Sequence, residues 1–528
     1  MNSRILHAFT RAFALVLTVP LTACGGGGVA ELPGPVDDPL AAAAQTITSE
    51  DMITRIGVLA HDSMRGRDTP SPGLEMAARY IVDSFRRMGL EGGAEGGEFI
   101  QRFPFPLIGL DTAGVALELS GAENLPSLVF GEDFVVSPGE VQSLTAPLVY
   151  VGPATAFADA RPAAASLAGL LPLANLPGEF NRATQVAINR ARAAAQVAGA
   201  QAILFALSAD VPDATFAQLH RFLSSPRRTL GGITDLTVVL LRQPAAARIL
   251  AAGGTRLEGP LGTPTAASPV PIGDLRASLA APLQVAADDE APNVIAILRG
   301  GDPELADEYV VFSAHMDHVG VGRPDETGDS IYNGADDDAS GTSAIIEVAE
   351  AFTNLLERPR RSLVFLLVSG EEKGLLGSRW FSEHPTVPLE NIVANINVDM
   401  IGRNAPDTIV VIGQEFSSLG PTVHGVAARN PQLGLTVAED PWPEERFFFR
   451  SDHFNFARKE IPAIFFFAGV HEDYHQPSDE VEKIDEDKAA RVARLIFYTA
   501  HAIADAVPPP TWTEEGLEQI RMLTAGGR

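Results

Sequence analysis

The feature that most constrains the fold is a series of short apolar runs in the second half of the chain. "NVIAIL", "YVVFSA", "SLVFLLVS", "IVANINV" and "AIFFF" follow one another between residues 293 and 467 with almost no polar alternation. Such runs are typical of strands that are buried on both faces, in a sheet covered by helices. Amphipathic helical patterns such as "TSAIIEVAEAFTNLL" lie between several of them. This alternation predicts an α/β fold with a mostly parallel central sheet flanked by helices.

Composition divides the rest of the chain into segments. Apolar residues recur at helical spacing after residue 49, whereas from about 112 to 271 Ala, Leu, Pro and Gly dominate and histidine is nearly absent. We therefore expect residues 49–111 and 285–508 to form one discontinuous domain, interrupted by an inserted β-rich α+β domain at 112–284. Residues 509–528 would form a peripheral C-terminal tail.

The N-terminal segment has the pattern of a secretory signal. Arg4 and Arg11 precede an apolar run that is too short to span a bilayer. The run ends in "LTAC", which resembles the lipobox of bacterial lipoproteins, with Cys24 as the lipidated residue. We expect residues 1–24 to be a lipoprotein signal peptide and residues 25–48 a flexible linker. The chain would be exported and lipid-anchored, in the outer membrane facing the periplasm or at the cell surface. The alternative is a cleaved signal with an incidental cysteine.

Charge and cysteine content narrow the possible partners. The formal net charge of −28 argues against nucleic acid, because phosphate binding requires a basic surface. The chain has one cysteine, which excludes an intramolecular disulfide.

Polar side chains follow several of the apolar runs. These residues are His315, Asp317, Glu371, Glu372, Asp399, Tyr474 and His475. Ligands of doubly wound sheets bind beyond the carboxyl ends of the strands, so we expect these side chains to gather at one edge. Imidazole and carboxylate groups without thiolate suit a hydrolytic zinc site, and several carboxylates make two ions plausible. The run "NGADDDASG" adds three adjacent aspartates, and it lacks the ligand spacing of a calcium-binding EF-hand.

Five segments carry a family resemblance. "SAHMDHVG", "NGADDDASG", "SGEEKGLLGS", "NVDMIG" and "DYHQPSDE" occur in order and resemble the motifs of the co-catalytic di-zinc aminopeptidases. That family also holds glutamate carboxypeptidases, transferrin receptors and glutaminyl cyclases. The resemblance covers residues 49–112 and 292–507, and the inserted region resembles more loosely the protease-associated domain. It implies a zinc exopeptidase-like fold and a metal-dependent exopeptidase that removes N-terminal residues from peptides.

The resemblance assigns metal ligands to residues of this chain. Two zinc ions per chain would be held by His315, Asp337, Glu372, Asp399 and His475. His315 and Asp399 would bind one ion, Glu372 and His475 the other, and Asp337 would bridge them. Other divalent ions would fit the same carboxylate-rich set.

The resemblance also assigns catalytic and supporting residues. Glu371 would be the general base toward a water that the two zinc ions activate, and Tyr474 would hydrogen-bond the developing oxyanion. Asp317 and Asp479 would orient the two ligand histidines. Relatives hold a cis peptide just after the bridging aspartate, so we expect the bond between Asp337 and Asp338 to be cis.

Several alternatives stay open at the level of sequence. His318 and His453 fit supporting or surface positions as well as metal ligation. A glutamate-type carboxypeptidase would need an arginine cluster, for which Arg403, Arg446 and Arg450 are available. A third possibility is a non-catalytic, receptor-like binding protein on the same fold. The oligomeric state and the preferred peptide do not follow from the sequence.

Overall fold

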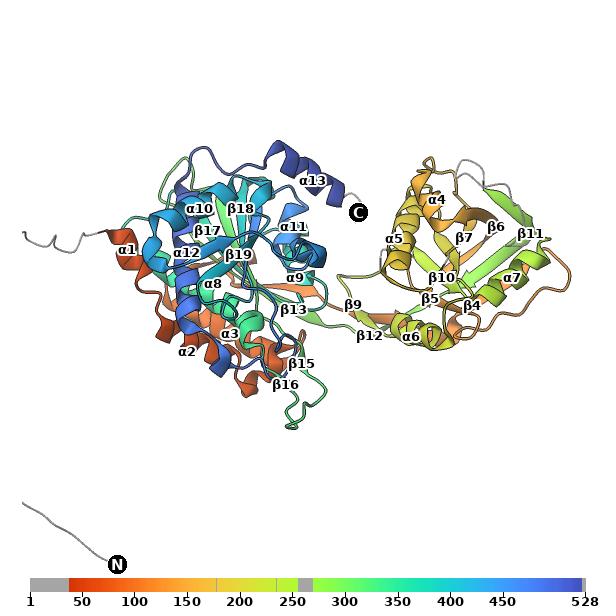
Figure 1. Cartoon of the computed structure of the whole chain (residues 1–528), viewed down its shortest axis with the longest axis horizontal. Coiled ribbons are helices and arrows are strands. Elements are labelled where there is room, and N and C mark those ends of the chain that lie inside the picture. Colours follow the sequence, from red (N-terminus) through yellow and green to blue (C-terminus); the bar gives the residue numbers. More distant parts are fainter. Residues whose placement is uncertain (1–37, 177, 234, 255–268, 525–528) are drawn as a thin grey trace, which may run out of the picture. The chain divides into compact units, whose positions relative to one another are not determined.

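The computed structural model describes residues 38–176, 178–233, 235–254 and 269–524 (Figure 1). The predicted signal peptide, Cys24 and most of the predicted linker lie outside these residues. In the part of the chain that is described, no helix is long and apolar enough to cross a membrane.

A central sheet is built from all five apolar runs. Its strand order is β1-β13-β17-β14-β18-β21-β19-β20, with β2 also paired to β13. The strands are β1 Glu91–Gly92, β2 Ile100–Pro104, β13 Glu290–Leu298, β14 Tyr309–His315, β17 Ser362–Val368, β18 Ile392–Val398, β19 Thr408–Ile412, β20 Thr436–Ala438 and β21 Ala463–Phe467. The α/β prediction is therefore confirmed.

The direction of the strands differs from the prediction at the edges of the sheet. β17, β14, β18 and β21 are parallel, whereas β13 joins β17 antiparallel and β19 joins β21 antiparallel. A run that is apolar on both faces predicts burial but carries no signal for strand direction. The sheet is thus parallel at its centre and mixed as a whole.

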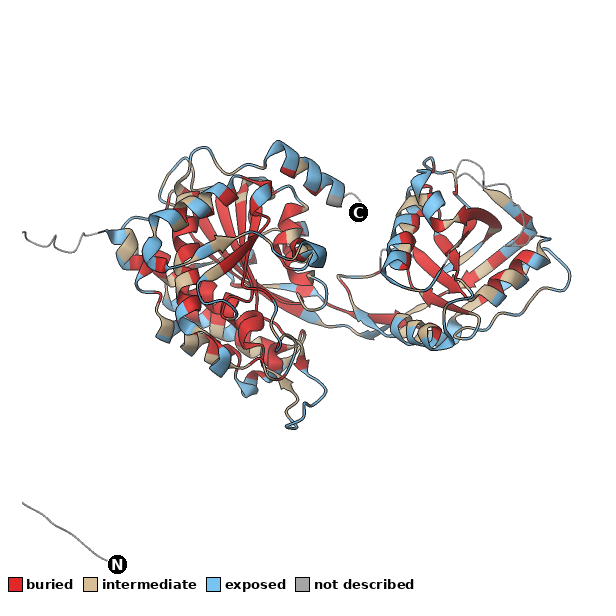
Figure 2. Cartoon of the chain, in the orientation of Figure 1, coloured by how far each residue is buried: buried red, intermediate tan, exposed pale blue. Residues whose placement is uncertain are grey.

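Helices cover both faces of this sheet (Figure 1). On one face the core contains residues of α2 Ser49–Leu59, α3 Pro72–Arg87, α8 Gly341–Thr353, α10 Leu419–Arg429 and α12 Glu486–Asp505. On the other face lie α9 Leu376–Glu383 and α11 His453–Ala457. Along β14, Val310 and Phe312 join the first core while Tyr309 and Val311 join the second. This alternation explains why β14 and its neighbour β17 are buried along their whole length (Figure 2).

The inserted segment forms a second sheet with its own apolar cores. Its strand order is β4-β11-β6-β7-β8-β10-β5. The elements are β4 Ala116–Ser120, β5 Phe134–Ser137, β6 Ser143–Pro153, α4 Ala154–Asp159, β7 Leu171–Asn175, α5 Arg182–Val197, β8 Ala202–Ala206, α6 Asp213–Ser224, β10 Thr237–Leu241, α7 Gln243–Ala252 and β11 Val270–Ala280. Because β6, β7, β8 and β10 are parallel and alternate with helices, the insert has an α/β centre rather than the predicted α+β arrangement.

The chain enters and leaves the insert through one pair of strands. β3 Leu107–Leu110 pairs antiparallel with β12 Leu283–Ala287, and short β9 Arg227–Arg228 pairs with β3.

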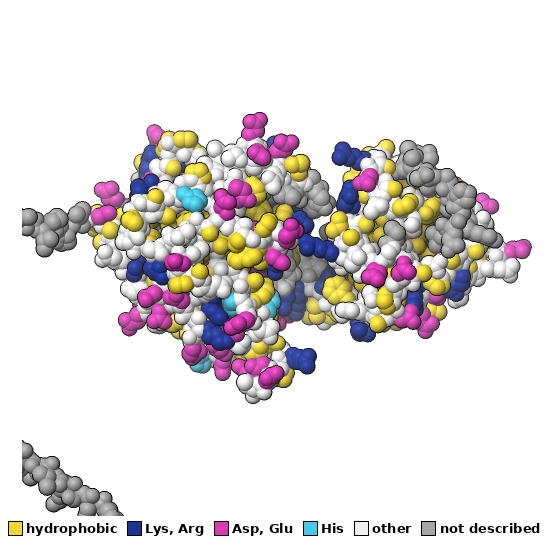
Figure 3. Space-filling model, in the orientation of Figure 1, with side chains coloured by type: hydrophobic (Ala, Val, Ile, Leu, Met, Phe, Trp, Pro, Cys, Tyr) yellow, Lys and Arg dark blue, Asp and Glu magenta, His cyan; other side chains and the backbone are white. Residues whose placement is uncertain are grey.

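The protein's acidic side chains are spread among basic and apolar ones on the face drawn in Figure 3.

Two expectations about the ends of the chain need correction. The predicted linker at 25–48 is wrong in its last part, because α1 Pro39–Ala44 buries Ala43 and Ala44, and Ile47 is buried as well. An alanine-rich stretch has high helix propensity, which the linker interpretation neglected. The predicted tail contains α13 Glu514–Thr524, whose Ile520 is buried in an apolar cluster.

Candidate metal centre

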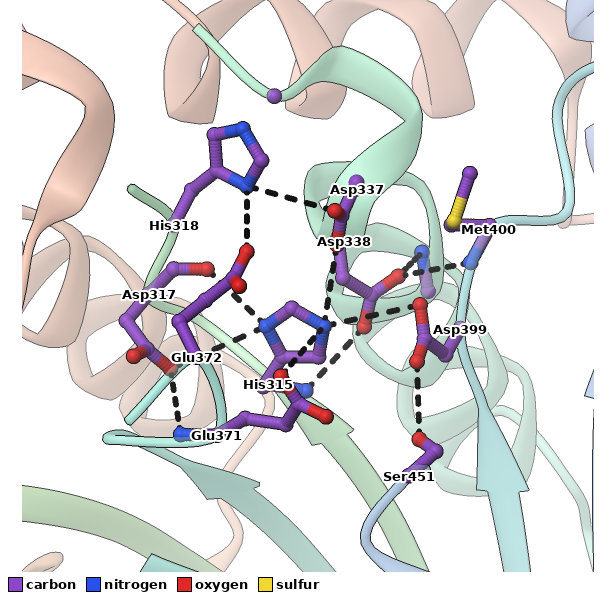
Figure 4. A network of polar contacts seen from close by, with 12 residues as sticks. His315, Asp317, His318, Asp337, Asp338, Glu371, Glu372, Asp399, Met400 and Ser451 are labelled. Carbon is purple, nitrogen blue, oxygen red and sulfur yellow. Dashed lines mark hydrogen bonds and ion pairs between the residues drawn. The ribbon is translucent and has the colours of Figure 1, made fainter. Parts of the chain in front are cut away.

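The strand ends bring the predicted polar residues together, as expected. His315 is the last residue of β14, Glu371 and Glu372 follow β17, and Asp399 follows β18. Because β14 lies between β17 and β18 and is parallel to both, these side chains reach the same edge (Figure 4).

One group of candidate ligands contains His315, Asp337 and Asp399, all buried. His315 Nε2 lies 3.2 Å from Asp337 Oδ1 and 3.6 Å from Asp399 Oδ1. Its other ring nitrogen, Nδ1, lies 3.1 Å from the main-chain carbonyl oxygen of Asp317. A proton on Nδ1 would donate to that carbonyl and leave Nε2 free to bind a metal.

A second group contains His318, Asp337, Glu372 and His475. His475 Nε2 lies 3.1 Å from both Asp337 Oδ2 and Glu372 Oε2. Asp337 is therefore shared, with Oδ1 toward His315 and Oδ2 toward His475. This is the arrangement that a bridging carboxylate requires.

Several buried polar atoms in the two groups lack a hydrogen-bond partner within the described part of the chain, and metal ions would satisfy them. Asp399 Oδ1, Asp337 Oδ2, Glu372 Oε1 and His475 Nε2 are buried and have no hydrogen-bond partner among the described residues. Leaving such an atom unsatisfied costs about 1–3 kcal/mol. Donors bound at about 2.0–2.2 Å to one zinc ion would lie roughly 2.8–3.6 Å apart when the angle between them is about 90–110°, which covers the separations in both groups. The residues present therefore fit two divalent ions.

Glu371 lies beside His315 of the first group, with its side chain 11% exposed. Its Oε2 is 4.0 Å from His315 Nε2. Burial, reinforced by the charges of Glu372 and Asp452, raises the pKa of Glu371 well above its ordinary value. A carboxylate with a raised pKa binds a proton more readily than an ordinary one, which suits a group that accepts and then returns a proton.

Tyr474 lines the same pocket as Glu371 and stacks on His475, with ring centroids 4.0 Å apart. Burial and the surrounding carboxylates raise its pKa further above the ordinary value of a phenol. The hydroxyl therefore stays protonated and can donate a hydrogen bond.

Asp317 supports the site in a different way from the prediction. Its carboxylate accepts from the main-chain N–H of Gly370 at 2.8 Å and from the Thr69 hydroxyl at 2.8 Å. Asp317 Oδ1 lies 3.8 Å from His315 Nδ1. The residue therefore contacts His315 through its main-chain carbonyl and uses its carboxylate to hold the turn that carries Glu371.

The role predicted for Asp479 is wrong. Its carboxylate accepts from the main-chain N–H groups of Asp336 and Asp337 at 3.1–3.2 Å, and no contact with His475 is seen among the described residues. Spacing in the motif suggested a partner for His475, but the loop turns the carboxylate toward the bridging aspartate.

The aspartate run joins three segments of the site. The peptide bond between Asp337 and Asp338 is cis, which confirms the prediction. Asp338 accepts from the main-chain N–H groups of His315, Gly341 and Met400 (Figure 4). It thus connects the end of β14, the start of α8 and the turn after β18.

Arg67 is a supporting residue that sequence reasoning missed. It is 1% exposed and donates to the carbonyl oxygens of Leu59, Met316, Asn333 and Gly334 at 2.6–3.0 Å. Because its partners are main-chain atoms, no complementary charged residue in the sequence marks it.

Asp399 is oriented by a residue from another loop. Ser451 donates its hydroxyl to Asp399 Oδ2 at 2.8 Å and accepts from the side-chain amide of Asn397 at 2.7 Å. His453, two residues later, is buried between Phe448 and Phe465. It therefore packs in the core and lies in neither candidate ligand group among the described residues.

The group of His315, Asp337 and Asp399 lines a pocket with an apolar wall. The wall is formed by Met400, Phe447, Phe465, Phe467 and Val470, and Arg450 also lines the pocket. The three phenylalanines 447–449 have different surroundings. Phe447 lines the pocket, whereas Phe448 packs against Phe416 and Phe449.

Comparison with known proteins bears on this site. Residues 293–500 match the family described as peptidase family M28. The chain carries a peptidase family M28 domain. The match spans β13 to α12, and thus all candidate ligands.

Curated relatives of the M28 domain are named as a zinc metalloprotease and a leucine aminopeptidase. A probable zinc metalloprotease of Pyricularia oryzae is 27% identical over 259 residues, which cover 41% of this chain and 50% of that protein. A probable leucine aminopeptidase of Arthroderma benhamiae is 26% identical over 233 residues, covering 41% and 58%. The chain thus spans about half the length of the curated relatives it matches.

Solved structures resemble the chain over a longer span. An aminopeptidase from Aneurinibacillus sp. strain AM-1 is 21% identical with a TM-score of 0.48, covering 88% of this chain and 95% of that one. A zinc aminopeptidase from Bacillus subtilis is 18% identical with a TM-score of 0.44, covering 86% and 94%.

Proposed function

We propose that the chain is a di-zinc aminopeptidase that removes N-terminal residues from peptides. The observation that carries this proposal is the shared Asp337, whose two oxygens face two separate histidine–carboxylate groups. The M28 domain and a relative named as a leucine aminopeptidase support it.

Five side chains would hold the two metal ions. His315 and Asp399 would hold one ion, and Glu372 and His475 the other, with Asp337 between them. When bound, two zinc ions polarise a carbonyl and lower the pKa of water.

Proton transfer would fall to Glu371 and charge stabilisation to Tyr474. Glu371 takes the proton of the attacking water and returns it to the amine that leaves as the peptide bond breaks. Tyr474 donates its hydroxyl to the carbonyl oxygen as negative charge develops there. Both side chains line the pocket beside the candidate ligands, so one substrate pose can reach them together.

The pocket wall favours an apolar N-terminal side chain. Phe447, Phe465 and Phe467 present ring surface next to the candidate ligands. Burying a leucine-sized side chain there contributes about 1.5–3 kcal/mol. We therefore expect Leu, Met or Phe at the peptide N-terminus to be preferred over Asp or Gly.

The test is hydrolysis of leucine p-nitroanilide by the purified protein with zinc and with chelator. Chelation should abolish turnover, and Glu371→Gln should lower kcat at least about a hundredfold because a general base contributes 10²–10⁴-fold. Arg429→Gln, a surface change at the end of α10, is the control that should keep its activity. Near-normal turnover by Glu371→Gln would contradict the mechanism.

A glutamate-type carboxypeptidase is the alternative of opposite polarity. Of its three candidate arginines, Arg450 lines the pocket, whereas Arg403 pairs with Asp473 at 2.8 Å and Arg446 lies over the ring of Phe449. Comparing an N-acetylated peptide with its C-amidated counterpart distinguishes the two enzymes. Cleavage of the C-amidated peptide alone supports the aminopeptidase. A receptor-like protein would cleave neither.

We also propose that the protein is exported and lipid-anchored at Cys24, with its insert a relative of protease-associated domains. The signal pattern and the "LTAC" sequence support the anchor. Expression in a Gram-negative bacterium with labelled palmitate tests it. The label should appear in the intact protein and disappear in Cys24→Ala, whereas an equal label in both would exclude lipidation at this residue.

A further inference from the structure

We propose that His318 is a sixth protein ligand of the metal centre, bound through Nδ1 to the ion held by Glu372 and His475. The proposal rests on the two-metal site described above and goes beyond its five expected ligands. His318 follows Asp317 in the segment that leaves β14, and it is fully buried.

The spacing of His318 matches that of the expected ligands. Its Nδ1 lies 2.9 Å from Glu372 Oε1 and 3.6 Å from Asp337 Oδ2. The corresponding separations around His315 are 3.2 and 3.6 Å. Donors bound at about 2.0–2.2 Å to one zinc ion lie roughly 2.8–3.6 Å apart when the angle between them is about 90–110°, so the position of His318 Nδ1 fits that of a ligand atom.

The contact between His318 and Glu372 is not a hydrogen bond in the structure. Within the described residues, His318 Nδ1 and Glu372 Oε1 are both buried without a hydrogen-bond partner, despite lying 2.9 Å apart. Two ligand atoms that bind one cation can lie this close together with no proton between them. A shared cation satisfies both atoms.

The ring of His318 is held in this orientation by its surroundings. A side chain on Gly334 would have its Cβ 2.6 Å from ring carbons of His318, so the ring packs directly on that glycine. On another side the ring meets His475 edge to face, with centroids 5.5 Å apart. Its main-chain N–H donates to the carbonyl of Arg67 at 3.3 Å. The imidazole is thereby directed into the cluster before any ion arrives.

The extra ligand makes the two positions unequal. One group offers His315, Asp337 and Asp399, whereas the other offers four residues with His318 included. The four-residue position should hold its ion more tightly and leave less room for substrate. The three-residue position keeps more open coordination for the peptide carbonyl or amine.

Paramagnetic NMR of the cobalt-substituted full-length protein tests the proposal directly. Ring signals of histidines bound to Co²⁺ are strongly shifted and can be counted. The wild-type protein should show three such histidines, His315, His318 and His475, and His318→Ala should show two. His471→Ala is the matched control, because the His471 side chain is 3% exposed and contacts Asp336, and His471 lies in neither group among the described residues. It should keep all three.

Zinc affinity provides the second readout. Competition titration should show one of two ions weakened at least a hundredfold in His318→Ala and unchanged in the control. Loss of a hydrogen-bonded neighbour alone would weaken binding about 10–100-fold, so the histidine count decides. Two shifted histidines in the wild-type protein would overturn the proposal even if affinity falls. A wild-type protein that binds no metal would instead contradict the proposed function.

Discussion

Glu371 and Glu372 are neighbours in the chain, but their surroundings shift their pKa values in opposite directions. Burial raises the pKa of Glu371 well above its ordinary value. Burial and the charge of Asp337 act on Glu372 in the same sense, but His318 and His475 outweigh them and lower its pKa to about 2. One carboxylate is thus kept ionised among imidazoles, while the other binds a proton more readily than an ordinary carboxylate.

This contrast predicts that changing each glutamate to glutamine affects a different property, zinc binding in one variant and turnover in the other. Glu372→Gln should lose one zinc ion per chain, because an amide is a far poorer zinc ligand than a carboxylate. Glu371→Gln should keep both ions and lose only turnover. Metal analysis after gel filtration in limiting zinc measures this. Equal zinc content in the two variants would contradict the division into ligand and base.

His453 gives a prediction about pH and stability. Burial lowers its pKa to about 3, whereas the unfolded chain has an ordinary value near 6.5. The unfolded state therefore binds more protons than the native state between these values, so stability is lost as pH falls below 6.5. The loss from this residue should be about 1.4 kcal/mol per pH unit until pH approaches 3.

Urea unfolding of the zinc-free protein at pH 7.5 and 5.5 measures the effect. His453→Phe keeps an aromatic ring between Phe448 and Phe465 and should reduce the stability difference between the two pH values by about 1.4 kcal/mol. The exposed His384 supplies the control, since His384→Gln should leave the difference unchanged. An unaltered difference in His453→Phe would show that the imidazole is not buried in its neutral form.

Among structural elements, Arg67 joins the segments that carry the candidate ligands. Its guanidinium connects the C-terminal end of α2, the residue after β14 and the turn before Asp337. Arg67→Met should leave several buried carbonyls unsatisfied and lower the free energy of unfolding by at least about 3 kcal/mol. Arg67→Lys should be intermediate, because lysine keeps the charge but lacks the five-donor fork.

Denaturant unfolding and zinc titration of these variants measure the two consequences. Arg65→Met is the matched control, since Arg65 is exposed in the same turn. It should change stability by less than about 0.5 kcal/mol. Zinc affinity should follow stability in the order wild type, Arg67→Lys, Arg67→Met. An Arg67→Met protein as stable as the control would exclude the joining role.

These elements also show what the sequence could predict. The apolar runs located five strands, and the polar residues after them located the expected metal ligands, because strand ends and ligand types are local signals. The partners of Asp479 and Arg67 are main-chain atoms of distant segments. Main-chain atoms occur at every position, so no residue pattern reveals such contacts. The antiparallel direction of β13 could not be predicted either, because an apolar run carries no signal for strand direction.

For the whole molecule, zinc should be a large part of the stability of the M28 domain. The candidate groups unite the ends of β14, β17 and β18 with the loop after β21. A ligand present at 1,000 times its dissociation constant stabilises the folded state by about 4 kcal/mol per site. Without ions, the buried carboxylates of Asp337, Glu372 and Asp399 repel one another.

Chelation should therefore lower the melting temperature by at least about 8 °C, since 1 kcal/mol shifts Tm by about 2–4 °C in a domain of this order of size. Differential scanning calorimetry with EDTA, and then with excess zinc, measures the shift and its reversal. Calcium in place of zinc is the control for general ionic effects and should not restore Tm. A Tm that is unchanged by EDTA would contradict metal binding in the native state.

The insert should be separable from the M28 domain. Asp111 N–H donates to the carbonyl of Pro282 at 2.8 Å, just beyond the paired ends of β3 and β12. A two-residue Asn-Gly turn closes antiparallel strands with such an end pair, so it can replace residues 112–281. All candidate ligands lie outside the excised segment. Among the described buried residues of the two insert cores, only Leu110 lies outside that segment.

The shortened protein should remain folded and bind two zinc ions with affinity within about threefold of the full chain, which calorimetry and zinc titration measure. Excision removes the pairing of β9 with β3, so a small loss of stability at that edge is expected. Residues 112–281 expressed alone should unfold cooperatively, since their strands order around their own cores. If the shortened protein aggregates and the isolated insert is unfolded, the two sheets form one cooperative unit. If the shortened protein binds zinc but no longer cleaves peptides, the insert contributes to substrate binding rather than to the metal centre.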